Sequence, residues 1–130
     1  MTMSTAESAR LLIAGHARRD AGEAEILEVS IGVPPDLRWF RGHFEGNPVL
    51  PAVVQLLEAL RLTTAAWPDL AGLRRITRAK FRAPIRPSDD LRLCLTRARG
   101  AGKVAFEYRR EAQVCSSGTL EFGPARGVDP

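Results

Sequence analysis

Hydrophobic and polar residues alternate with a period of two over much of this 130-residue chain. Between Ala24 and Val33, the apolar residues Leu27, Val29 and Ile31 are separated by polar or small residues, which predicts a half-buried strand. Similar segments follow in the second half, where the turn-forming stretches RPSDD and RGAGK separate some of them. These further strands are expected over residues 73–83, 91–97, 103–109 and 113–122.

A helical segment stands between the first strand and the others. Pro51 suits the first position of a helix, and Trp67-Pro68 ends the segment. Apolar residues cover nearly all sides of the helix predicted over residues 51–67, which is typical of a buried helix. A strand, a buried helix and a run of antiparallel strands predict an α+β fold, with a sheet curled around one helix.

The N-terminal residues show a different pattern. Ser4 can cap a short helix, with Glu7 three residues later and Leu11 and Leu12 on its apolar side. This pattern predicts a helix from Ser4 to Arg19. The length of the chain favours a single domain over residues 1–130.

Composition narrows the classes of partner. The formal net charge of +4 and the pI near 9.8 fit nucleic acid, an anionic membrane or an acidic protein. Only 6% of residues are aromatic, and neither zinc-finger spacing nor a basic helix with heptads is present, so no nucleic acid is expected. No apolar run is long enough for a signal peptide or a membrane span. We expect an acidic protein partner.

The cysteines and histidines do not form a metal motif. Cys94 and Cys115 lack Cys-x-x-Cys spacing, and His16 and His43 lie far apart in the sequence. We therefore expect no metal site, two free thiols and a cytoplasmic protein.

The stretch GHFEGNPVLP, residues 42–51, places His43 in a turn just before the predicted helix. The ordinary pKa of histidine lies near neutral pH, which suits proton transfer. The alternative is an imidazole that only hydrogen-bonds the backbone of its loop.

The longer segment GHFEGNPVLPAVVQL resembles the active-site segment of the hot-dog-fold 3-hydroxyacyl-ACP dehydratases, and it is most similar to their aryl polyene pathway branch. The stretch AKFRAPIRPSDDLRL is similar to the strand and turn that follow in this family. The resemblance covers residues 24–122, whereas residues 1–23 form a poorly matched N-terminal extension. It implies an antiparallel sheet wrapped around one long central helix, and paired subunits with two acyl tunnels at their interface.

The resemblance also implies a reaction. Family members remove water from a (3R)-hydroxyacyl thioester on acyl carrier protein, giving the trans-2-enoyl thioester without metal or cofactor. His43 matches the family's base. The first amides of the helix, at Ala52 and Val53, are expected to stabilise charge on the thioester oxygen, although the family usually has glycine where Ala52 stands. Leu57 and Phe44 complete the expected substrate-binding residues, and packing within the loop is the alternative for Phe44.

The family's acid is not in its usual place. It lies fourteen residues after the histidine, where this chain has Leu57, and the nearest carboxylate is one residue further on, at Glu58. One residue turns an α-helix by about 100°. Either a π-bulge absorbs the extra residue and Glu58 is the acid, or the acid is lost and Glu58 pairs with Arg61. In the second case a partner subunit could supply the acid.

A basic row follows the helix. Arg78, Lys80 and Arg82 alternate along one strand and are expected on one face, which could dock the acidic carrier protein. Arg41, adjacent to the active-site loop, is another candidate for docking, near a tunnel mouth. The alternative is a solvated strand face.

Two other functions stay open: an acyl thioesterase, and a non-catalytic hot-dog subunit that completes a heterodimeric dehydratase. The subunit is expected to form a homodimer or a heterodimer with another hot-dog chain.

Overall fold

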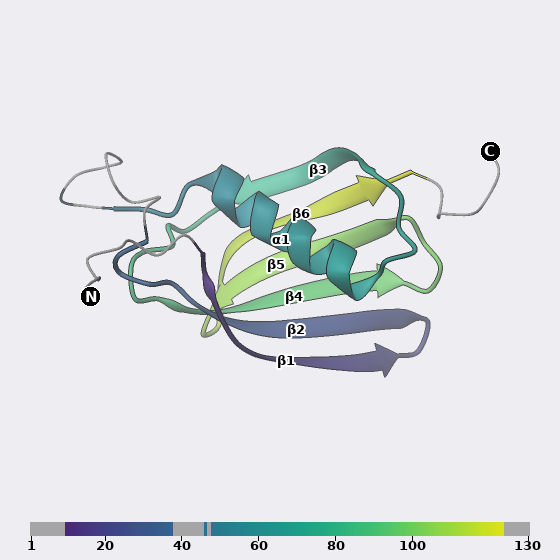
Figure 1. Cartoon of the computed structure of the whole chain (residues 1–130), viewed down its shortest axis with the longest axis horizontal. Helices are drawn as coiled ribbons and strands as arrows, with labels where there is room; N and C mark the ends of the chain where they lie inside the picture. The colour runs from purple at the N-terminus through teal and green to yellow at the C-terminus, as the bar shows by residue number, and fades with distance from the viewer. Residues whose placement is uncertain (1–9, 38–45, 47, 124–130) are drawn as a thin grey trace, which may run out of the picture.

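The structure, a computed structural model, describes residues 10–37, 46 and 48–123. The described residues form one antiparallel sheet of six strands in the order β1-β2-β4-β5-β6-β3, and helix α1 lies across one face of it (Figure 1). The helix spans Ala52–Ala66. The strands are β1 (Leu12–Ala21), β2 (Ala24–Gly32), β3 (Leu73–Phe81), β4 (Asp90–Ala98), β5 (Lys103–Arg110) and β6 (Gln113–Phe122).

The predicted strands after residue 24 are confirmed, and so is the sheet around a single helix. The bounds agree within two residues, since β3 ends at Phe81 and not at residue 83. The alternation is also confirmed, because the apolar residues of β5 that face the helix are buried and their neighbours are not. This arrangement is the one expected of the hot-dog fold.

The helix predicted over Ser4–Arg19 is wrong for the residues that the structure describes. Strand β1 occupies Leu12–Ala21 and pairs with β2 through a tight turn at Gly22, whose φ of 68° favours glycine. A short isolated helix is marginally stable, whereas a strand beside β2 satisfies backbone groups on both chains. Residues 4–9 lie outside the described residues.

Strand β1 is also attached to the end of the helix. The guanidinium of Arg18 donates a hydrogen bond to the Ala66 carbonyl at 2.9 Å and lies 5.1 Å from the centre of the Trp67 ring. A cation at the C-terminal end of a helix interacts favourably with its dipole. This contact connects the edge hairpin to α1, so β1 is part of the sheet and not a separate extension.

The core lies between α1 and the inner face of the sheet. Its largest fully buried side chains include Phe106 and Tyr108 of β5 and Leu93 and Leu95 of β4. Burial of such a side chain contributes about 1.5–3 kcal/mol. Gly118 of β6 lies opposite Phe106, and a Cβ there would come within 2.6 Å of the Phe106 ring, so the strand needs glycine at this position.

The prediction of a helix buried on all sides is wrong. Val54, Gln55, Ala59 and Thr63 are buried, but Val53 and Leu57 are 57% and 56% exposed. One helix on one sheet buries only the side that faces the strands, and the described residues provide no second layer. Pro51 is the N-cap and not the first helical residue. No helix among the described residues is long and apolar enough to cross a membrane.

Candidate active site

The site is built around the start of α1. Pro51 has extended backbone angles, and its carbonyl accepts the first helical hydrogen bonds, from the amides of Val54 at 3.1 Å and Gln55 at 3.3 Å. The amides of Ala52 and Val53 precede this ladder and therefore have no acceptor within the helix. They lie at the positive end of the helix dipole, which favours a negative charge beside them. Both residues are exposed.

Three of the predicted site residues, His43, Phe44 and Arg41, lie outside the described residues, and their roles stay predictions. The described chain resumes at Pro48 and runs into the helix through Leu50. The amide of Leu50 donates to the carbonyl of Ile85 at 2.7 Å, which fixes the approach to α1 beside the segment that follows β3.

A buried polar network lies under the first turns of α1, and the sequence analysis missed it. The side chain of Gln55 donates to the Leu50 carbonyl at 3.1 Å and accepts a hydrogen bond from the Ser116 hydroxyl at 2.7 Å. The Tyr108 hydroxyl donates to the Gln55 carbonyl, also at 2.7 Å. Polar residues at inward-facing positions of alternating strands were the signal that could have identified Ser116 and Tyr108.

Tyr108 acts in this network as a neutral donor. Burial raises the pKa of its hydroxyl far above the usual value, and the nearby Glu58 carboxylate raises it further. Ionisation would place a negative charge in the apolar core, so the proton stays on the tyrosine oxygen. The hydrogen bond to the helix carbonyl is therefore present over the whole physiological pH range.

Leu57 and Glu58 occupy different sides of a regular helix. Helix α1 is α-helical from Ala52 to Ala66, so the π-bulge proposed as one alternative is absent. Leu57 points away from the sheet, whereas the Glu58 side chain is mostly buried. The helix thus presents an apolar side chain at position 57, where the resemblance predicts the family's acid.

The predicted pairing of Glu58 with Arg61 is confirmed. The Arg61 Nη2 lies 2.6 Å from one carboxylate oxygen of Glu58, and its Nε lies 3.2 Å from the other. This two-point hydrogen bond raises the pKa of Arg61. Both oxygens of the Glu58 carboxylate accept hydrogen bonds from Arg61, and this engagement weighs against Glu58 as the acid.

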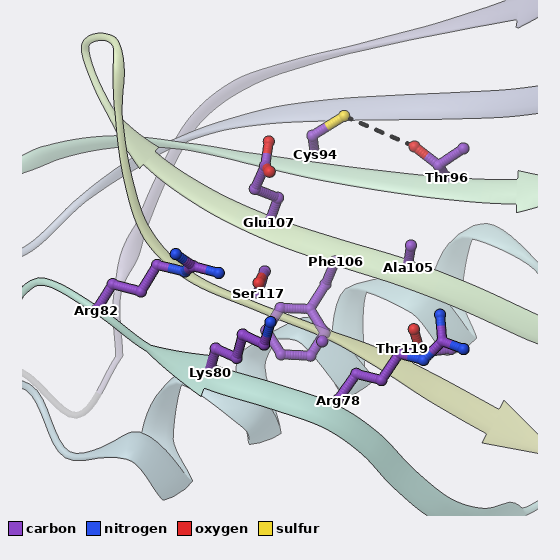
Figure 2. A pocket seen from close by; sticks show the side chains of 11 residues that line it. Arg78, Lys80, Arg82, Cys94, Thr96, Ala105, Phe106, Glu107, Ser117 and Thr119 are labelled. Carbon is purple, nitrogen blue, oxygen red and sulfur yellow. Dashed lines mark hydrogen bonds between the residues drawn. The ribbon is translucent and has the colours of Figure 1, made fainter.

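The predicted basic row lies on the outer face of the sheet, away from α1. Figure 2 shows Arg78 and Lys80 of β3 and Arg82, just after this strand, side by side along a groove of about 360 Å³. Their position on one face is confirmed. Glu107 borders the same groove but is paired with Arg109 at 2.6 Å. Within the described part of the chain, no ion pair involves the three basic residues of the row.

A β-bulge shapes this row. Thr77 pairs with Thr119 and Lys80 with Ser117, so β3 advances three residues while β6 advances two. Arg78 lies in the bulge with a φ of 57°, which is uncommon for a residue with a side chain. The bulge places Thr77 on the same face as its neighbour Arg78, and this change of register was not readable from the period-two pattern.

Comparisons with known proteins agree with this architecture. A structure of an uncharacterized protein from Erwinia carotovora subsp. atroseptica superposes with a TM-score of 0.78, at 30% identity, over 88% of this chain and 97% of that one. The dehydratase heterocomplex ApeI:P from Xenorhabdus doucetiae superposes with a TM-score of 0.73, at 22% identity, over 87% and 97% of the two chains. The fold and the helix that carries the site define a hot-dog-fold protein.

The sequence comparisons identify the family. The model of the ApeI-like family, described as ApeI dehydratase, matches residues 18–119. The chain therefore belongs to the ApeI-like dehydratase family. A 3-hydroxyacyl-[acyl-carrier-protein] dehydratase, FabZ, from Lactobacillus helveticus is 38% identical over 94 residues, which are 65% of this chain and 64% of that protein. The chain spans 64–66% of the lengths of the first curated relatives that it matches.

Proposed function

We propose that this protein acts in the dehydration of (3R)-hydroxyacyl-ACP to trans-2-enoyl-ACP, in fatty acid or polyene-type synthesis. The observation that carries the proposal is the start of α1. The amides of Ala52 and Val53 precede the helical ladder and stand on an exposed surface, directly after the segment that contains His43. Membership of the ApeI-like dehydratase family supports the same chemistry.

The proposed reaction divides among three groups. The His43 imidazole removes the proton from the α-carbon, and negative charge develops on the thioester oxygen. The amides of Ala52 and Val53 donate hydrogen bonds to that oxygen, a contact that strengthens as the charge grows. An acid protonates the departing hydroxyl, so that a carbon–carbon double bond and one water form. No oxidant or reductant is required.

The acid is the group that this chain does not present at the expected place. Leu57 is exposed where the family has a carboxylate, and Glu58 is bound to Arg61. We propose that a second hot-dog chain covers the exposed side of α1 and supplies the acid. The heterodimer, in which this chain is one of two unlike subunits, is therefore the second candidate function.

We propose that the partner lies against the start of α1 and the end of the edge strand β3. Besides Val53 and Leu57 on α1, Phe81 at the end of β3 is exposed, and β3 pairs only with β6 among the described strands. Leu12 and Ile13 of β1, at the other edge of the sheet, are exposed as well. The end of β3 lies at the same end of the molecule as the start of α1, as the Leu50–Ile85 hydrogen bond shows. Apolar surface and an open strand edge favour association with another chain.

We further propose that the basic row Arg78, Lys80 and Arg82, together with Arg41, docks the acidic carrier protein. A row of cations without ion pairs in the described residues supports electrostatic steering of an acidic partner. A triple alanine variant of the row would lower the rate of association with the carrier protein, and high salt would reduce the difference. The same variant should process the corresponding coenzyme A thioester normally.

The proposed location is the cytoplasm, where free thiols such as Cys94 and Cys115 stay reduced.

The first experiment is mass spectrometry of 3-hydroxyacyl-ACP after incubation with the purified protein, the His43→Ala variant and the Glu58→Gln variant. Loss of one water, abolished only by His43→Ala, would establish the dehydratase and place the acid elsewhere. Loss abolished by both changes would assign the acid to Glu58. No loss over a range of chain lengths would reject a stand-alone dehydratase and favour the heterodimer. Hydrolysis of an acyl-ACP that lacks the hydroxyl would instead identify a thioesterase.

A further inference from the structure

Three polar side chains from three elements meet under the start of α1, in the buried core. Gln55 belongs to the helix, Tyr108 to β5 and Ser116 to β6. Their exposed fractions are 4%, 0% and 1%. Tyr108 and Ser116 are direct partners in the β5–β6 register, so both side chains project from adjacent strands toward the same part of the helix.

Burial of these groups is unfavourable unless they are hydrogen-bonded, and each of them is. Gln55 uses its amide nitrogen on the Leu50 carbonyl and its amide oxygen on the Ser116 hydroxyl. The assignment of these two amide atoms follows from the network, because the hydroxyl donates to oxygen and the carbonyl accepts from nitrogen. Tyr108 donates to the backbone carbonyl of Gln55.

The positions of these bonds along the chain are informative. One anchor, the Leu50 carbonyl, lies just before the helix, and the other, the Gln55 carbonyl, lies in its first turns. Ala52 and Val53 stand between the two anchors. Their amides can move relative to the sheet only if the network breaks or the backbone between the anchors deforms.

We propose that Gln55, Ser116 and Tyr108 are positioning residues, which hold the amides of Ala52 and Val53 in the geometry needed to stabilise the thioester oxygen. The inference rests on the proposed dehydratase function and adds to it the residues that orient the oxyanion contact. None of the three touches the reacting atoms. Their effect is transmitted through the backbone from Leu50 to Gln55.

A buried hydroxyl two turns further along the helix provides a matched control. Thr63 is fully buried, and its hydroxyl has no hydrogen-bond partner in the part of the chain that the structure describes. Replacement of Thr63 by valine removes a buried hydroxyl from α1 and preserves the shape of the side chain. It leaves the hydrogen bonds of Gln55, Ser116 and Tyr108 unchanged, so it shows the effect of a polar-to-apolar change in the helix alone.

The kinetic experiment compares Ser116→Ala, Tyr108→Phe and Thr63→Val in the dehydration assay, with the partner chain present if the activity requires it. We expect Ser116→Ala and Tyr108→Phe to lower kcat by about tenfold to a hundredfold, because small displacements of a catalytic group have effects of this size. KM should change less than twofold. Thr63→Val should keep the wild-type kcat, and Ser116→Thr, which retains the hydroxyl, should recover most of it.

A second experiment measures the same positioning without substrate. Amide hydrogen exchange across residues 50–56 should be faster in Ser116→Ala and Tyr108→Phe than in the wild type, and unchanged in Thr63→Val. Faster exchange in this segment, with no turnover by any variant, would support the network and count against the dehydratase function. Wild-type kcat in both network variants would overturn the positioning role, even if exchange were faster.

Discussion

The two sides of helix α1 differ in burial and in the residues that cover them. The side that faces the sheet buries Ala59 and Thr63, and its polar residue Gln55 has hydrogen-bond partners from two strands. The opposite side exposes Val53 and Leu57, which are apolar and have no cover in the described chain. The inner side is covered within one chain, whereas the outer side leaves two large apolar side chains exposed to solvent.

This difference separates the parts of the site that the chain itself provides from those that it lacks. The amides of Ala52 and Val53 are held from the inner side through the network under the helix. The acid would have to come from the outer side, where Leu57 stands. Helix amides that are held from the inner side, beside an apolar residue at position 57, fit the proposed subunit that works with a second chain.

The largest expected effect is a difference in stability between two leucine-to-alanine changes. Leu95→Ala, in the sheet under the inner side, should lower the free energy of unfolding by about 2–5 kcal/mol, because it leaves a cavity in a closed core. Leu57→Ala should change it by no more than about 0.5 kcal/mol. Urea denaturation of both variants measures the difference. Equal losses would mean that the outer side is already covered in solution.

A carboxylate on the outer side should supply the missing acid. We expect Leu57→Glu to raise the dehydration rate of the chain without its partner by about 10²-fold or more, the size of a general acid contribution. Leu57→Gln, which has the same length but donates no carboxylic proton, is the control. Product formation followed by mass spectrometry provides the measurement. The same low rate in both variants would contradict the assignment of position 57.

Polar substitutions on the outer side should weaken assembly and not folding. In the Val53→Ser/Leu57→Ser variant we expect the dissociation constant for the partner hot-dog chain, or for a second copy, to rise more than about tenfold, because each apolar side chain contributes about 1.5–3 kcal/mol when buried. Sedimentation equilibrium measures assembly, and the thermal midpoint of the dissociated chain should stay unchanged. An unchanged dissociation constant would place the interface elsewhere.

The smallest effect concerns the connection after the helix. Arg97 is buried, and its guanidinium donates to both oxygens of the more exposed Asp69, at 2.9 and 2.7 Å, which lowers the pKa of that carboxyl. The folded pKa is depressed, so the stabilisation is complete above the unfolded value of about 3.9 and is lost as the pH falls through the folded value. We expect the thermal midpoint of Asp69→Asn to lie below that of the wild type at pH 7.

Acidification provides the control for this pair. As the pH falls through the lowered pKa of the folded Asp69 carboxyl, this carboxyl becomes neutral, and the difference between the two midpoints should shrink. If the difference between the two thermal midpoints were unchanged at pH 2, the Asp69→Asn change would destabilise the protein for a reason other than the loss of charge.

Sequence patterns predicted most of the fold because the strands after residue 24 alternate clearly and one helix interrupts them. The prediction of a helix near the N-terminus was wrong. It was based on a local capping and apolar pattern, whereas the strand forms because β1 pairs with the open edge of β2. The site was predicted in part. The spacing from His43 marked Leu57 as the place of the expected acid, which stays a prediction. The pairing of Glu58 with Arg61 is confirmed, because it depends only on neighbouring residues of one helix.

The sequence by itself determined an α+β fold with a sheet around one helix and the position of that helix, since periodicity acts over a few residues. The resemblance of the segment that begins at residue 42 added the hot-dog fold. Tertiary structure decided which side of α1 is buried, that a bulge interrupts β3 at Arg78, and that Gln55 meets Tyr108 and Ser116. Those contacts join residues 53 and 61 positions apart in the chain. A period shows which face a side chain occupies, but only the register of paired strands determines what it touches there.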